Sequence, residues 1–125
     1  MELDLDHLLN MTGGDADLAE EVIDIFESQT ETWGRMLSVD LPQRDWADAA
    51  HTLKGAALSI GAVELAEVCR QAETLGRGDT EVSRVHAATM LSDVKDCLNT
   101  TLDACAKARH VLSRPGLRAS KDSNS

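Results

Sequence analysis

Aromatic residues and prolines are scarce in this sequence. The 125-residue chain contains one phenylalanine, two tryptophans, no tyrosine and two prolines. A core with so few rings must be built from Leu, Val, Ile and Ala side chains. The sequence also lacks the alternation of Val, Ile and Thr with polar residues that is typical of half-buried strands. These absences predict an all-α protein, and the length is that of one domain.

Long apolar runs and basic residues are also missing. No run approaches the ~18–20 residues needed to cross a bilayer, and the acidic start MELDLDHLLN is not typical of a secretory signal. Lys and Arg number 12 against 22 Asp and Glu, a net charge of −10. Residues 114–125 carry +2 of this total, so residues 1–113 carry −12. Such a surface repels nucleic acids and anionic membranes. We therefore expect neither as a partner and predict a cytoplasmic protein.

The three cysteines follow no ligand or redox pattern. Cys69, Cys97 and Cys105 are odd in number, and their spacing fits neither a zinc site nor a CxxC motif. Each lies on or near an apolar helical stripe. We therefore predict reduced, buried thiols and no metal bound by the chain.

Apolar residues recur with helical periodicity along most of the chain. The pattern predicts a short helix over residues 4–10, a long helix that Asp15 caps and that ends near Asp40, and helices at about 43–60, 62–75 and 80–112. Four long amphipathic helices with short connections predict an up-down-up-down antiparallel four-helix bundle, with the short first helix covering one end. The bundle domain would span residues 1–112, followed by a disordered tail over 113–125.

The same periodicity predicts which side chains face the core. The expected stripe of the second helix is Leu18, Val22, Ile25, Phe26, Trp33 and Leu37. The fourth and fifth helices would bury Leu65, Val68, Cys69, Ala72, Leu75, Val85, Leu91, Val94, Leu98, Cys105 and Leu112.

The helix predicted over residues 43–60 carries a histidine on its outward side. At 100° per residue, six of its apolar residues share one face. These residues are Trp46, Ala49, Ala50, Leu53, Ala57 and Ile60. His51 then points roughly 150° away from the centre of that face, into solvent.

Three residues follow His51 on the same side of the helix: Lys54, Gly55 and Leu58. Lys54 places a cation where an anion attached to His51 would lie. Gly55 costs the helix ~1 kcal/mol relative to alanine, and its bare backbone would let another protein approach closely. Leu58 adds an apolar residue to an exposed face, as a docking contact would.

An exposed imidazole with such neighbours can accept a phosphoryl group. Free histidine has a pKa of ~6.5, so the neutral ring is well populated near pH 7. One ring nitrogen can attack an aspartyl phosphate while the other holds its proton, and a nearby cation stabilises the transferring charge. No glycine-rich phosphate loop accompanies the histidine. The pattern alone also fits ordinary solvated surface.

Residues 50–77, AHTLKGAALSIGAVELAEVCRQAETLGR, closely resemble the histidine phosphotransfer (Hpt) family. The family pattern is a histidine, then Lys and Gly three and four positions later and Gly ten positions later. Here these are His51, Lys54, Gly55 and Gly61. The upstream segments LLNMTGGDADLAEEVIDIFES and DWADAAHTLKG are also similar to the family. The resemblance covers residues 3–77, and the last helix only through its amphipathic pattern.

The resemblance implies that His51 accepts and donates the phosphoryl group. The group would be exchanged with aspartates of response-regulator receiver domains, which supply the carboxylates and the Mg²⁺, and a hybrid histidine kinase would complete the relay. Lys54 then matches the charge-stabilising lysine, and Gly55 the residue that clears the docking face. Glu73 matches a Glu or Gln that can hydrogen-bond the ring, and Arg77 an arginine near the site. A solvated acid and a turn residue are the alternatives for these two. We expect a monomer.

Three other functions are weighed against this interpretation. A non-catalytic helical adaptor would bind its partner through the Leu58 face, but it has no need of an exposed His51 beside Lys and Gly. A histidine kinase dimerisation domain would need ATP-binding motifs. A di-iron bundle would need Glu-x-x-His pairs, and the sequence has none.

The remaining histidines, His7, His86 and His110, match nothing in the pattern and are predicted to be surface residues. Trp33 and Trp46 are predicted in the core or at its rim.

Overall fold

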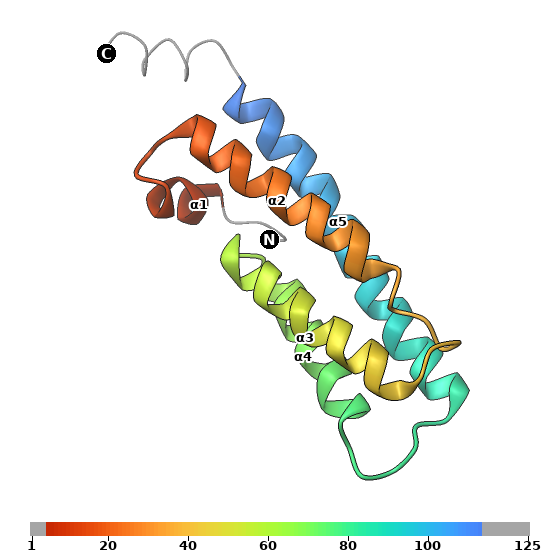
Figure 1. Ribbon diagram of the computed structural model, residues 1–125. Coiled ribbons are helices and arrows are strands. Elements are labelled where there is room, and N and C mark those ends of the chain that lie inside the picture. The colour runs from red at the N-terminus through yellow and green to blue at the C-terminus, as the bar shows by residue number, and fades with distance from the viewer. Residues whose placement is uncertain (1–4, 114–125) are drawn as a thin grey trace, which may run out of the picture.

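The computed structural model describes residues 5–113, and this part of the chain is helical throughout apart from its connections (Figure 1). The helices are α1 (Leu5–Met11), α2 (Ala16–Gly34), α3 (Gln43–Ser59), α4 (Val63–Gly76) and α5 (Arg84–Leu112). Most of the predicted tail, residues 114–125, lies outside the described residues. Within the described part, no helix is both long enough and apolar enough to span a bilayer.

The four long helices form one bundle. Helix α3 packs most extensively against α4, while α2 packs against α3 and α5, and α4 against α5. In Figure 1 successive long helices run in opposite directions, and α1 lies at the end of the bundle where α2 begins. The predicted all-helical bundle is therefore confirmed.

Helix α3 places its apolar face as the periodicity predicts. Its predicted core residues all lie in the interior: Trp46, Ala49, Ala50, Leu53, Ala57 and Ile60. The helix ends where Gly61 adopts a left-handed conformation with φ of 74°, a backbone state that glycine takes without steric cost. The Ala62 N–H then donates to the Ala57 carbonyl over 2.9 Å, which closes the turn into α4.

Two predicted helix boundaries are wrong. Helix α2 ends at Gly34 rather than near Asp40, because glycine favours helix termination and residues 35–42 instead form the connection to α3. Helix α5 begins at Arg84 rather than Thr80. Ser83 caps it, since its hydroxyl oxygen accepts the His86 N–H over 3.2 Å.

Three residues predicted to be buried are exposed instead. Leu18 and Ile25 of α2 are 43% and 55% exposed, and Val85 of α5 is 78% exposed. The buried residues of helix α2 combine two large side chains with three small ones: Ala16, Ala19, Ile23, Phe26 and Thr30. The prediction counted only large apolar residues and therefore placed the centre of the buried stripe too far round the helix. Phe26 and Leu37 are buried as predicted.

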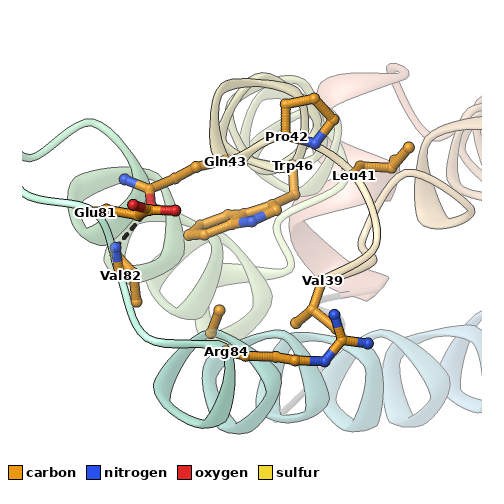
Figure 2. A pocket seen from close by; sticks show the side chains of 9 residues that line it. Val39, Leu41, Pro42, Gln43, Trp46, Glu81, Val82 and Arg84 are labelled. Carbon is orange, nitrogen blue, oxygen red and sulfur yellow. Dashed lines mark hydrogen bonds between the residues drawn. The ribbon is translucent and has the colours of Figure 1, made fainter.

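Close packing fixes the end of α4 against the beginning of α3. A Cβ on Gly76 would lie 2.6 Å from Trp46 Cζ3 and 2.7 Å from Ala47 Cβ, so only glycine lets the two helices approach this closely. The Gln43 side chain donates to the Gly76 carbonyl over 3.0 Å. It also accepts the Val82 N–H over 2.8 Å (Figure 2). Trp46 also lines a cavity of about 280 Å³ between the two long connections. These contacts position the last turn of α4 beside α3.

Candidate functional site

His51 projects from the middle of α3 into solvent. Its side chain is 60% exposed, whereas Ala50 and Leu53 on either side of it are 0% and 1% exposed. The predicted outward orientation of His51 is confirmed. It follows from the helical phase, since the apolar residues predicted to face the core can do so only if His51 faces away.

The tight turn between α3 and α4 brings Glu73 opposite the histidine. The Nδ1 atom of His51 lies 2.8 Å from Glu73 Oε2, and Lys54 Nζ donates to Glu73 Oε1 over 2.9 Å. An ionised carboxylate only accepts hydrogen bonds, so Nδ1 must carry the proton in this contact. The lone pair of the neutral ring is then on Nε2, the nitrogen farther from Glu73.

Arg77 extends this polar cluster to a second carboxylate. Its Nε donates to Glu73 Oε2 over 3.0 Å, and its Nη2 donates to Asp48 Oδ1 over 2.8 Å. Asp48 lies one turn before His51 on α3. Arg77 therefore bridges the end of α4 to the face of α3 that carries the histidine.

Glu73 is ionised in this environment. Its side chain is only 15% exposed, but hydrogen bonds from Lys54, and then from Arg77 and His51, lower its pKa from 4.5 to about 2. Desolvation by burial acts in the opposite direction and is outweighed. The carboxylate thus presents a fixed negative charge to the ring of His51 at all physiological pH values.

Comparisons with known proteins identify the family of this chain. Residues 19–108 match the Hpt domain family. This chain belongs to the Hpt domain family. Its fold is similar to the crystal structure of histidine phosphotransferase ShpA from Caulobacter crescentus, with a TM-score of 0.73 and 30% sequence identity over 95% of this chain and 98% of that one. A search of curated protein sequences gave no match. Family membership assigns the chain to two-component phosphorelays, where Hpt domains interact with response-regulator and kinase components.

The surface of the Hpt domain beside His51 is open and partly apolar. A Cβ on Gly55 would meet nothing within 4 Å, so this position is bare helix surface. Leu58 and Val63 are 55% and 65% exposed, and they line a groove of about 190 Å³ together with Lys54. Leu58 was predicted on this face, and Val63 was not.

The structure brings together four of the residues that the sequence singled out: His51, Lys54, Glu73 and Arg77. Arg77 is not merely a turn residue, because its guanidinium joins the cluster. Asp48 was not predicted as a site residue. Its position three residues before His51 is a detectable signal, because residues three apart share a helix face.

The remaining histidines and cysteines lie outside the cluster. His7 of α1 and His86 and His110 of α5 are exposed, as predicted. Cys69 and Cys105 are buried, and burial raises the pKa of their thiols to about 12 and about 11, whereas Cys97 is only half-buried. Among the described residues, no three His, Cys, Asp or Glu side chains are grouped as metal ligands would be.

Replacing Glu73 tests the electrostatics of the site. Because folding lowers the Glu73 pKa, its ion pairs contribute stability that is fully present above about pH 4.5 and is lost as the pH falls toward 2. The melting temperature of Glu73→Gln should therefore lie below that of wild type at pH 7, and the difference should shrink in acid. Thermal melts between pH 7 and pH 2 measure this, with Glu21→Gln, an exposed α2 position, as the control. A difference that stays constant over this range would contradict the low pKa.

Proposed function

We propose that His51 is the phosphoryl-accepting residue of this Hpt domain. In this proposal the domain receives the group from the aspartate of one response-regulator receiver domain and passes it to the aspartate of another. The observation that carries the proposal is the contact between His51 Nδ1 and Glu73, 2.8 Å long. It holds the proton on one ring nitrogen of an exposed imidazole and leaves the lone pair on the other.

The transfer step follows from this arrangement. The Nε2 lone pair attacks the phosphorus of the aspartyl phosphate, a P–N bond forms, and the bond from phosphorus to the aspartyl oxygen breaks. The leaving aspartate keeps that electron pair and becomes a carboxylate. The imidazole ring, still protonated at Nδ1, gains positive charge, which the ionised Glu73 stabilises. Lys54, 2.9 Å from the same carboxylate, lies close enough to offset the charge of the incoming phosphoryl group.

The partner supplies the rest of the chemistry in this proposal. The receiver domain holds the Mg²⁺ and the carboxylates that phosphoryl transfer from an aspartate generally needs, and a hybrid histidine kinase begins the relay. The name of the structurally similar protein, a histidine phosphotransferase, supports a transfer role over a purely adaptor role. The adaptor alternative also gives no reason for an exposed histidine that is hydrogen-bonded to the largely buried carboxylate of Glu73.

A transfer assay tests the proposed function. Receiver domains from the source organism are phosphorylated, each is mixed with the Hpt domain, and the label is followed on both proteins. We expect at least one receiver to lose its label to the Hpt domain, in a form that is acid-labile and base-stable, as phosphohistidine is. The receiver should regain the label when unphosphorylated receiver is added in excess. No transfer from any receiver, or an acid-stable label, would contradict the proposal.

A further inference from the structure

The charges around His51 are balanced in a specific way. Lys54 and Arg77 both donate to Glu73, and Arg77 also donates to Asp48. Two cations thus face two carboxylates before any phosphoryl group is present. Glu73 has a role in the transfer step because it holds the ring proton, whereas that step leaves Asp48 unexplained.

Asp48 lies where its charge would act on a phosphorylated His51. Residues three apart on a helix are surface neighbours, with Cβ atoms about 5–6 Å apart. The Asp48 side chain is 53% exposed and makes its ion pair with Arg77 across the helix pair. A phosphoryl group on His51 would therefore have the Asp48 carboxylate one turn away. Asp48 and the phosphoryl group would compete for the same cation, Arg77.

Arg77 would have the opposite effect on the same group. Its Nε bonds the Glu73 oxygen that also receives the His51 N–H, so its guanidinium lies beside the ring. Arginine is always charged and carries five N–H donors, which suits it to phosphoryl oxygens. Asp48 holds one end of this guanidinium over a distance of 2.8 Å and so restrains it from turning toward a phosphoryl group.

We propose that Asp48 and Arg77 are an opposed pair of residues that sets how readily phosphorylated His51 gives up its phosphoryl group. Asp48 raises the free energy of the phosphorylated form, by direct repulsion and by restraining Arg77. Arg77 lowers it by attraction. The balance between them keeps the group transferable in both directions. This inference rests on the proposed phosphorylation of His51.

The equilibrium of phosphoryl exchange with a receiver domain tests the pair. For Asp48→Asn the ratio of phosphorylated Hpt domain to phosphorylated receiver should rise about two- to fivefold, the effect expected of one partly exposed charge. For Arg77→Gln the ratio should fall by a similar factor, and Arg77→Lys should restore most of it. Both effects should shrink at high ionic strength. Asp93→Asn, an exposed aspartate on α5, is the matched control and should leave the ratio unchanged.

The opposite signs separate this role from a structural one. If the ion pair only held α4 against α3, both substitutions would change the equilibrium in the same direction, and the inference would be wrong. The inference would also be wrong if the Hpt domain became phosphorylated but neither substitution changed the ratio of phosphorylated Hpt domain to phosphorylated receiver. If wild-type His51 took no label at all, the proposed function itself would fail and this inference with it.

Discussion

Gly55→Gln is expected to lower the transfer rate by about 100-fold or more, because misplacing reacting groups by about 1 Å can cost that factor. The ring nitrogen must come within ~3–3.5 Å of the phosphorus for in-line attack. Gly55 lies one turn after His51, and a Cβ there would meet nothing within 4 Å. A glutamine would thus fill space that an approaching receiver uses without disturbing the bundle. Transfer from a saturating phosphorylated receiver measures the rate.

Stability should move in the other direction. Glutamine is a better helix former than glycine, so Gly55→Gln should raise the free energy of unfolding by about 0.5–1 kcal/mol. Gly55→Ala is the matched control, because it gives the same helix benefit with far less bulk and should retain most of the transfer rate. Lys54→Ala should slow transfer without preventing docking. Unchanged transfer in Gly55→Gln would show that the receiver approaches from another side or that a different histidine is the acceptor.

Leu53→Ala is expected to lower the free energy of unfolding by about 2–5 kcal/mol, the range for truncating a buried leucine. Leu53 is 1% exposed in the centre of α3. Leu58→Ala is a matched control on the same helix, since Leu58 is 55% exposed and its truncation should cost about 1 kcal/mol or less. Denaturant unfolding of the three proteins gives the comparison.

His51→Ala should resemble Leu58→Ala in stability. The imidazole is 60% exposed, and the one hydrogen bond it loses is worth about 0.5–1.5 kcal/mol. A large loss of stability in His51→Ala together with a small one in Leu53→Ala would show that the helical phase of α3 is wrong. The argument for an exposed acceptor would then fail.

The sequence predicted α3 and its histidine well because α3 has a clear amphipathic pattern. Its six predicted core residues include three alanines, and all six are buried. Their common phase places His51 outward without reference to any other helix. Helical spacing also placed Lys54, Gly55 and Leu58 on the side of His51. The resemblance to the Hpt family then added Glu73 and Arg77, and residues 19–108 do match that family.

Features that depend on contacts between helices were predicted less well. In α2, tight packing buries Ala16, Ala19 and Thr30 and leaves the larger Leu18 and Ile25 exposed. Such a choice depends on how close the neighbouring helices lie, which periodicity does not give.

The Asp48–Arg77 ion pair likewise joins residues 29 positions apart. It exists because the end of α4 lies against the start of α3. Gly76 makes that approach close, since any larger side chain there would collide with Trp46. The sequence does not show that Gly76 packs against Trp46. The family resemblance placed Glu73 and Arg77 near His51, but periodicity did not predict that Arg77 would reach Asp48.

The central claim is that Nε2 of His51 carries the phosphoryl group, and one measurement tests it most directly. The Hpt domain is labelled with ¹⁵N-histidine and phosphorylated by its receiver, and NMR identifies the nitrogen coupled to phosphorus. His51→Gln serves as the negative control, with His86→Gln and His110→Gln as matched variants at exposed histidines. We expect coupling of phosphorus to Nε2 of His51, no phosphorylation of His51→Gln and full phosphorylation of the other two variants. Phosphorylation that persists in His51→Gln, or coupling of phosphorus to Nδ1, would contradict the account.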